Sequence, residues 1–296
     1  MKDTDVSAAN TTPLVSVVIS AYNRPDYLQS AIASVLSQTF GDYEIIVVDD
    51  CSPVSLETVL QDIAFPVRYH RLAQNSGANK ARNEGVRLAQ GCYVAFLDDD
   101  DAWLPRKLEW QLPQVQEATA CIGGYEYMDT HQPFVKPIQQ VSEKMLKRGN
   151  PYCGMSGLIC EREWLLQHPF DEALSNGQDW DIFVRLAQQA PLRYVARPLF
   201  LYRRGSHESI TTKVKKLGLA DMEKRLGAVR KHRHWLGESN YRLRVAQILL
   251  GYIGSRKNPA QFVWAALRQG GAVATGRVLW EKFGNFIRRG GRVATH

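Results

Sequence analysis

Residues Tyr93–Leu104 read YVAFLDDDDAWL, an apolar run that ends abruptly in four consecutive carboxylates. The apolar half predicts a buried strand. Adjacent carboxylates repel one another and share little solvent at a sheet edge, so we expect a cation close to them. Hard oxygen ligands of this kind suit Mg²⁺ or Mn²⁺. The alternative is a solvated acidic turn ahead of a helix beginning near Pro105, because a helix N-terminus favours acidic residues.

Three more strands are predicted upstream of this run, each followed by a helical segment. We expect strands at residues 14–21, 43–48 and 67–72. A helix after the first strand would have Leu28, Ile32, Val35 and Leu36 on one face, and two more are expected at 54–63 and 75–90. Such alternation predicts an α/β fold with a doubly wound, mostly parallel, Rossmann-like sheet. Ligands of these sheets bind beyond the carboxyl ends of the strands. Tyr22, Asp50 and Asp98–Asp101 all follow strands, which predicts one crevice containing all of them.

The ligand of this crevice is constrained by missing motifs. The sequence has no G-x-G-x-x-G after its first strand and no G-x-x-x-x-G-K-[ST], so it lacks the main signatures of a dinucleotide fold and a P-loop NTPase. A nucleotide whose phosphates are held through a metal, with Asp50 accepting a hydrogen bond from the base or ribose, fits an acidic crevice better.

Charge is distributed unevenly along the chain. Residues 1–212 contain 19 Lys and Arg against 26 Asp and Glu, whereas residues 213–296 contain 18 against 4. We therefore expect different partners for the two parts: a metal-neutralised phosphate substrate for the first, and an anionic surface for the second.

Composition favours a globular intracellular protein. The chain has 296 residues, of which 45% are hydrophobic. We find neither a secretion signal pattern nor an apolar run long enough to span a membrane, and we expect residues 1–13 to be disordered. Five cysteines without a C-x-x-C pair are expected to be reduced thiols. We expect a cytoplasmic location, at the inner face of the cell membrane.

Five motifs together resemble one known family. They are Val17–Arg24 (VVISAYNR), Val47–Ser52 (VVDDCS), Asn75–Gly85, Phe96–Pro105 and Gly177–Asp181 (GQDWD). In type and order they resemble the family-2 glycosyltransferases of GT-A fold, over about residues 14–212. The resemblance implies a transferase domain there and leaves residues 213–296 as a helical basic extension.

The resemblance also implies roles for individual residues in donor binding. Tyr22 and Asp50 would line the nucleotide base, Arg82 would lie near the base and diphosphate, and Asp99 near the ribose. Asp98 and Asp100 would form the family's D-x-D pair, with Asp100 the first choice as ligand of a divalent metal, Mn²⁺ or Mg²⁺. His207, in a segment that resembles the family's closing loop, would join the metal once the donor is bound.

By the same resemblance, Asp179 would be the general base that deprotonates the acceptor hydroxyl, and the product would have inverted anomeric configuration. The family commonly has Glu where Gln178 stands, so Asp181 remains a second candidate for the base. Asp181 could instead be an ordinary acid at a helix N-terminus.

Residues 215–296 have helical periodicity without a recognised motif. Leu279, Phe283, Phe286 and Ile287 share one predicted face, and Phe262, Val263, Ala266 and Leu267 share another, with Trp264 and Trp280 as candidate interfacial anchors. Basic amphipathic helices with aromatic residues are typical of peripheral membrane contacts, which we expect for residues 256–296. The alternative is packing on the catalytic domain or on a second copy of the chain.

The sequence predicts a metal-dependent inverting hexosyltransferase that uses a nucleotide sugar, with UDP the expected nucleotide. Its acceptor would be a glycan or polyprenyl-linked glycan in the assembly of lipopolysaccharide O-antigen, capsule or exopolysaccharide. Alternatives are a nucleotidyltransferase, a non-catalytic sugar-nucleotide binder and a nucleic-acid-binding protein. We expect no nucleic acid partner, because the basic extension lacks a zinc, basic-zipper or clear helix-turn-helix signature.

Overall fold

A computed structural model describes residues 12–61, 63–189, 191–204 and 217–288. Its first half is a parallel sheet formed by β1 (Val15–Ala21), β2 (Tyr43–Asp49), β3 (Val67–Arg71) and β4 (Tyr93–Asp98). These strands lie in the order β3-β2-β1-β4. The connections are α1 (Pro25–Leu36), the 3₁₀ turn η1 (Leu56–Leu60) and α2 (Ala78–Leu88). The predicted alternation is confirmed, and the expected helix at 54–63 is a shorter 3₁₀ turn.

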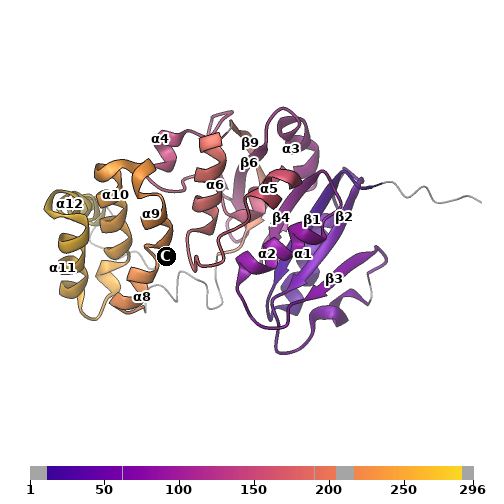
Figure 1. Cartoon of the computed structure of the whole chain (residues 1–296), viewed down its shortest axis with the longest axis horizontal. Coiled ribbons are helices and arrows are strands. Elements are labelled where there is room, and N and C mark those ends of the chain that lie inside the picture. The colour runs from indigo at the N-terminus through magenta and orange to yellow at the C-terminus, as the bar shows by residue number, and fades with distance from the viewer. Residues whose placement is uncertain (1–11, 62, 190, 205–216, 289–296) are drawn as a thin grey trace, which may run out of the picture.

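Beyond β4 the sheet becomes mixed, in the order β4-β8-β6-β9-β5. It contains β5 (Ala102–Trp103), β6 (Ala120–Tyr127), β8 (Ile159–Glu161) and β9 (Leu192–Tyr202), and β7 (Pro133–Phe134) pairs with β6. Strands β6 and β9 are parallel, whereas β8 runs antiparallel to both β4 and β6. The acidic run therefore lies where the parallel half of the sheet meets the mixed half (Figure 1).

Helical segments also follow β4 along the chain. They are α3 (Lys107–Val115), α4 (Glu143–Leu146), η2 (Met155–Gly157), α5 (Arg162–Gln167) and α6 (Gln178–Gln189). Helix α3 packs on β6 and β9, and η2 packs on β4. Helix α4 is a single turn.

The C-terminal part of the described chain is helical. It comprises α8 (Leu219–Lys224), α9 (Gly227–Lys231), α10 (Arg233–Leu249), η3 (Ile253–Ser255), α11 (Pro259–Gly270) and α12 (Ala272–Arg288). These helices form one end of the molecule, on the far side of α6 from the parallel strands (Figure 1). The expected boundary at 212/213 and the expected disorder of 1–13 fall wholly or mainly outside the described residues. No helix in the described ranges combines the length and apolarity needed to cross a bilayer.

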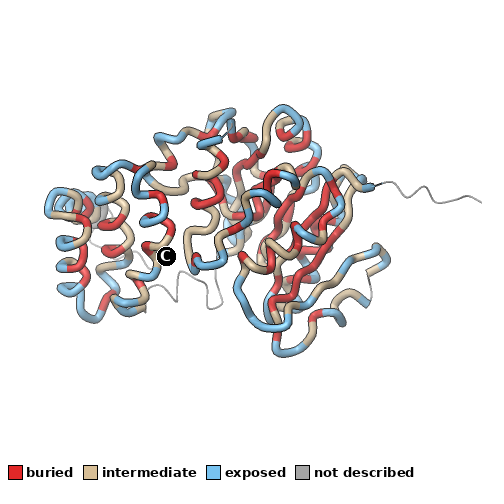
Figure 2. Tube along the Cα trace, in the orientation of Figure 1, coloured by how far each residue is buried: buried red, intermediate tan, exposed pale blue. Residues whose placement is uncertain are grey.

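The core is centred on β1, β2 and β4, where Figure 2 shows buried residues along each strand. Successive residues of β1 point to opposite faces, and Val17, Val18 and Ile19 are all fully buried. Both faces are therefore covered, as in other parallel sheets. Helix α2 packs on β1 and β2, and Gly85 permits the close approach: a Cβ there would lie 2.3 Å from Val18 Cγ1.

We predict that Gly85→Ala destabilises the fold, because the added methyl group overpacks the contact with Val18. The free energy of unfolding should fall by about 1–3 kcal/mol in chemical denaturation. Gly276→Ala in α12 is the matched control, since a Cβ there meets nothing within 4 Å. The control should be neutral or stabilising, because Ala is the better helix former. Equal stability of the two variants would contradict the proposed close packing.

Candidate active site

The four carboxylates of the acidic run have different environments because the chain turns sharply after β4. The amide of Asp101 donates to the carbonyl of Asp98 across this turn, at 3.1 Å. Asp101 is buried and accepts hydrogen bonds from Ser156 Oγ at 2.6 Å and from the amide of Arg203 at 3.1 Å. Burial raises its pKa well above the usual value. Asp101 thus ties the turn to η2 and to the end of β9.

Asp98 lies at the end of β4 and pairs with Arg82 of α2. The distance from Arg82 Nη2 to Asp98 Oδ1 is 2.6 Å, and Arg82 Nη1 donates to Asn79 Oδ1 at 3.3 Å. Arg82 is buried, with its guanidinium 5.9 Å from the ring centre of Phe170. The structure therefore brings Arg82, predicted to serve the donor, directly to the acidic run.

Asp99 and Asp100 share a cation that the sequence analysis did not assign to the site. Arg24 Nη1 lies 3.0 Å from Asp99 Oδ1 and 2.8 Å from Asp100 Oδ2. Asp99 also accepts from the amide of Tyr22 at 3.0 Å. Burial raises the pKa of Asp99 to about 7, although the hydrogen bond from Tyr22 and the charge of Arg24 act to lower it. Arg24 follows β1, so its position after a neighbouring strand could have identified it.

A divalent cation fits the donor set at this turn. Among the described residues no three His, Cys, Asp or Glu side chains converge as a ready-made metal site. Asp98 and Asp100 nevertheless keep side-chain exposures of 31% and 35%, whereas that of Asp99 is 8%. Mg²⁺ and Mn²⁺ sites often use one or two carboxylates together with substrate phosphates, which is what these two residues offer. His207 lies outside the described residues.

Asp50 and Tyr22 lie at the same edge of the sheet, because β2 pairs in parallel with β1. The Asp50 carboxylate accepts from the amides of Ser76 at 2.7 Å and Gly77 at 2.8 Å, immediately before α2. The Tyr22 side chain is exposed. The structure thus gathers Tyr22, Asp50, Arg82 and the acidic run at the carboxyl ends of three strands, as predicted, while their roles remain predictions.

Asp179 lies in the first turn of α6, close enough to Arg82 for their charges to interact. Its Oδ2 accepts from Asn150 Nδ2 at 2.7 Å, and the Asn150 amide also donates to the carbonyl of Cys153 at 2.6 Å. The residue is partly accessible, yet desolvation of its carboxylate raises its pKa above the usual 3.8. The hydrogen bond from Asn150 and the charge of Arg82 act in the opposite direction and lower the pKa. Asn150 was not identified from the sequence, where nothing marks it as a partner of α6.

Asp181, the second candidate for the base, has a different environment. It is buried, and its Oδ1 lies 2.7 Å from His232 Nε2 and 2.9 Å from Lys231 Nζ. Its Oδ2 accepts from Arg185 Nε at 3.0 Å. Although burial opposes ionisation, these partners hold the pKa of Asp181 below its usual value. Both oxygens are engaged in a structural ion network, so the contacts favour Asp179 as the base.

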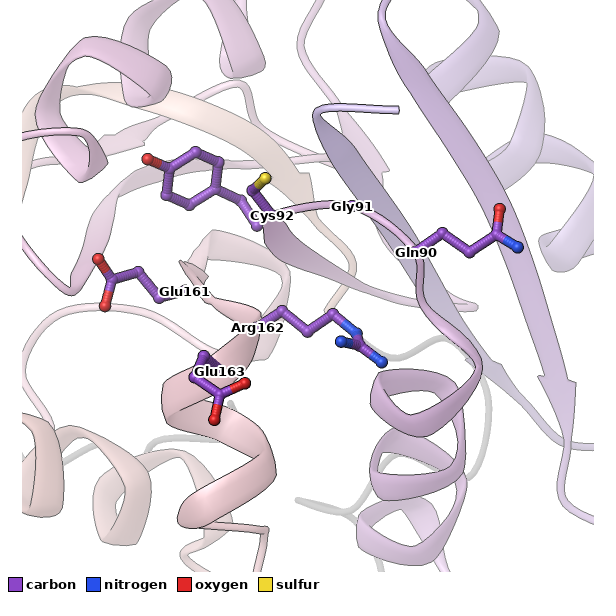
Figure 3. A pocket seen from close by; sticks show the side chains of 7 residues that line it. Gln90, Gly91, Cys92, Glu161, Arg162 and Glu163 are labelled. Atoms are coloured by element: carbon purple, nitrogen blue, oxygen red, sulfur yellow. The ribbon is translucent and has the colours of Figure 1, made fainter. Parts of the chain in front are cut away.

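A surface pocket of about 450 Å³ lies elsewhere, between the start of β4 and the start of α5 (Figure 3). Its lining includes Cys92, Glu161 and Arg162. Because β4 begins at Tyr93 and ends at Asp98, this pocket is at the opposite end of the strand from the acidic run. The converging carboxylates and arginines, rather than this depression, mark the candidate active site.

Known proteins resemble this chain over its catalytic part. TuaG of Bacillus subtilis, described as a teichuronic acid biosynthesis glycosyltransferase, is 44% identical over 124 residues, covering 40% of this chain and 49% of TuaG. WfgD of Escherichia coli, a UDP-Glc:alpha-D-GlcNAc-diphosphoundecaprenol beta-1,3-glucosyltransferase, is 30% identical over 181 residues, covering 58% of this chain and 69% of WfgD. The chain thus spans about half the length of TuaG, and 63% of a Haemophilus influenzae glycosyltransferase that is 32% identical.

Solved structures share the fold at low sequence identity. Residues 1–349 of S. aureus TarS in complex with UDP-GlcNAc superpose with a TM-score of 0.60 at 15% identity, covering 95% of this chain and 93% of that one. The mannosyltransferase PcManGT from Pyrobaculum calidifontis, in complex with GDP-Man and Mn2+, gives 0.59 at 15% identity, covering 94% and 81%. These likenesses confirm the predicted GT-A fold.

The family model for glycosyl transferase family 2 matches residues 16–172, just over half of the chain. The matched region contains β1, β2, the acidic run and Arg82, which meet at one edge of the sheet. The predicted resemblance is thereby confirmed, and the chain belongs to glycosyl transferase family 2.

Proposed function

We propose that this chain transfers a sugar from a nucleoside diphosphate donor to a glycan acceptor with inversion at the anomeric carbon. The observation that carries the proposal is the separation of two carboxylate sites. Asp98 and Asp100 lie on the turn after β4, whereas Asp179 lies on α6, and Arg82 is close to both. In-line displacement needs positive charge at the leaving group and a base near the incoming hydroxyl, so it requires two such sites.

In this proposal the donor nucleotide occupies the edge formed by β1, β2 and α2. Tyr22 would stack on the base, Asp50 would accept from a base N–H, and Asp99 would bind the ribose. Arg82 would pair with the diphosphate, exchanging its contact with Asp98 for phosphate oxygens. UDP is the nucleotide we propose, since TarS is solved with UDP-GlcNAc and WfgD is named for UDP-Glc.

Asp100, with Asp98, would hold a divalent cation on the donor phosphates. When bound, this cation neutralises the charge that develops on the departing diphosphate. The residues fit this role because they are the more exposed carboxylates of the run and supply only oxygen ligands. Arg24, which already bridges Asp99 and Asp100, would keep those carboxylates oriented.

Asp179 would accept the proton from the acceptor hydroxyl as that oxygen attacks. A pKa raised above 3.8 makes the carboxylate a stronger base than an exposed aspartate. The Asn150 amide and the backbone amide of Trp180 donate hydrogen bonds that hold the carboxylate in place. Because base and leaving group lie on opposite sides of the sugar, the product has inverted configuration.

For the acceptor we propose a lipid-linked glycan in bacterial surface polysaccharide assembly. The support comes from relatives: WfgD is named for a diphosphoundecaprenol acceptor, and TuaG for teichuronic acid biosynthesis. We retain residues 14–212 as the transferase domain and 213–296 as the basic extension. A cytoplasmic location at the inner face of the cell membrane follows from this acceptor class and also remains a proposal.

We expect Asp100→Ala and Asp179→Asn to separate binding from transfer. Asp100→Ala should abolish the rise in melting temperature that a UDP-sugar produces in the presence of Mn²⁺, because the metal ligand is lost. Asp179→Asn should keep that rise and reduce transfer by about 10²–10⁴-fold, the usual contribution of a general base. A thermal-shift panel of UDP, GDP, dTDP and CDP sugars with and without Mn²⁺, followed by a transfer assay, measures both.

Asp26→Ala is the matched control, because Asp26 is an exposed acid near the start of α1 and outside the site. It should bind donor and transfer sugar as the unaltered protein does. Normal transfer by both site variants would refute the assigned roles. Binding without a metal requirement would remove the proposed function of Asp98 and Asp100.

The C-terminal helices offer a surface for the membrane contact that we propose. In α12 Val273, Trp280, Phe283 and Ile287 are 88%, 76%, 56% and 60% exposed. Their spacing places them on one face, opposite the face that buries Thr275 and Val278. In α11, Phe262 and Ala266 of the predicted stripe are buried, whereas Leu267 of that stripe and the neighbouring Trp264 are exposed, so part of the stripe packs inside the protein.

We propose that an anionic lipid surface covers these exposed residues. Tryptophan and phenylalanine insert readily at the boundary between headgroups and acyl chains, and the extension carries 18 basic residues against 4 acidic ones. Arg268 lies against Trp264, with its guanidinium 5.5 Å from the ring, so positive charge accompanies the exposed aromatic residues.

We expect Trp280→Ser combined with Phe283→Ser to weaken binding to phosphatidylglycerol vesicles by about tenfold or more, from the apolar area lost. Vesicle flotation measures the bound fraction, while transfer to a water-soluble acceptor should be preserved. Val54→Ser is the control, because Val54 is 74% exposed but lies near β2. Unchanged flotation of the double variant would exclude this surface.

A further inference from the structure

The first turn of α6 is held by the C-terminal helices on the side away from the sheet. Figure 1 shows α9 beside α6, with α10 on the other side of α9. Lys231 and His232 bond Asp181, and Lys231 Nζ also pairs with Asp171 Oδ2 at 2.8 Å. The extension is therefore anchored two residues from Asp179, and the contact between His232 and Asp181 is buried.

Trp180, between Asp179 and Asp181, is the second anchor. It is buried, and its Nε1 donates to the carbonyl of Leu146 at 2.7 Å. Its ring meets His232 edge-on, with centroids 5.4 Å apart, and Arg244 of α10 lies 5.4 Å from its centre. Side chains of the extension thus surround the residue next to the proposed base.

Arg244 connects these contacts to Asp179 itself. Its Nη1 donates to the carbonyl of Arg148 at 3.1 Å, and two residues later Asn150 bonds Asp179. Gly149, between them, makes room for the guanidinium: a Cβ there would lie 2.9 Å from Arg244 Nη1. The segment 148–150 is therefore a short bridge from Arg244 to the Asp179 carboxylate.

The two side chains also interact through charge. Burial lowers the pKa of Arg244 to about 10, and the charge of Asp179 acts in the opposite direction. Arg244 remains a cation at neutral pH, although its Nε is buried without a partner among the described residues. A guanidinium placed in this way stabilises the ionised form of a nearby carboxylate.

We infer that Arg244 is a positioning residue for the proposed base: from α10 it holds segment 148–150 against Asp179 and favours the ionised carboxylate. This inference rests on the proposed function, because it takes Asp179 as the base. It makes the C-terminal extension part of the catalytic apparatus, beyond any role in membrane contact.

The pH dependence follows from the groups that face Asp179. They are Arg82 of α2, Arg244 of α10, the Asn150 amide and the Cys153 thiol, whose pKa burial raises so that it stays neutral. Arg82 lowers the pKa of Asp179, and Arg244 is a second cation whose charge interacts with that of Asp179. Removal of one cation should raise that pKa. The acid limb of the pH profile, where kcat/KM falls because Asp179 becomes protonated, should then move to higher pH.

The test is Arg244→Gln, with its pH profile compared with that of the unaltered chain. We expect the acid limb to move up by about half a pH unit, which is about a threefold loss of rate on that limb. Binding of a UDP-sugar with Mn²⁺ should be unchanged. Arg244→Lys keeps the charge and should return the limb to its original position, an effect that a purely packing role would not produce.

Arg242→Gln is the matched control, because Arg242 lies on the same helix but is exposed and pairs with Glu238 at 2.7 Å. An unmoved limb in Arg244→Gln, or a limb displaced equally by Arg242→Gln, would overturn the inference. If Arg244→Gln does not fold, the Lys variant decides, since an upward shift there contradicts it. Full transfer by Asp179→Asn would instead show that the proposed base is wrong.

Discussion

Electrostatic balance at the end of β4 is the constraint on which the site depends. A strand buried on both faces ends in four carboxylates, and burial raises the pKa values of Asp99, Asp100 and Asp101. Arg24, immediately before α1, and Arg82 of α2 pair with carboxylates of this run and offset part of its negative charge. Asp98 and Asp100 stay partly exposed, so the positive charge of a divalent metal can be accommodated there.

The same principle explains why Asp179 and Asp181 differ, although they lie two residues apart on one helix turn. Asp181 faces the extension, where Lys231 and His232, together with Arg185 of α6, hold its pKa low. Asp179 has Arg82, Arg244 and amide donors as neighbours, which compensate its desolvation only in part, so its pKa is raised. One sequence motif thus gives an ion-paired carboxylate, Asp181, and a candidate general base, Asp179, because nearby residues of a helix point in different directions.

Features of the fold and site that depend on local sequence could be predicted, whereas contacts between residues far apart in the sequence could not. The strands and the positions of Asp50 and Asp98–Asp101 at their ends were predicted, because periodicity and strand order are local signals. Arg24 could have been predicted in the same way, because it too follows a strand of the parallel sheet. Asn150 and Arg244 were not, because they meet Asp179 across 29 and 65 residues of sequence through packing that no local pattern encodes.

The sequence of the extension left two alternatives open, membrane contact and internal packing. The structure shows that some of its apolar and basic residues pack inside the protein. Phe262 and Ala266 are buried, and Lys231, His232 and Arg244 meet the first turn of α6. The exposed residues of α12 are on the opposite side of that helix from its buried face. The two roles are therefore compatible, because different surfaces serve them. A chain that meets lipid through α12 and holds its base through α10 would bring its active site to the membrane without changing it.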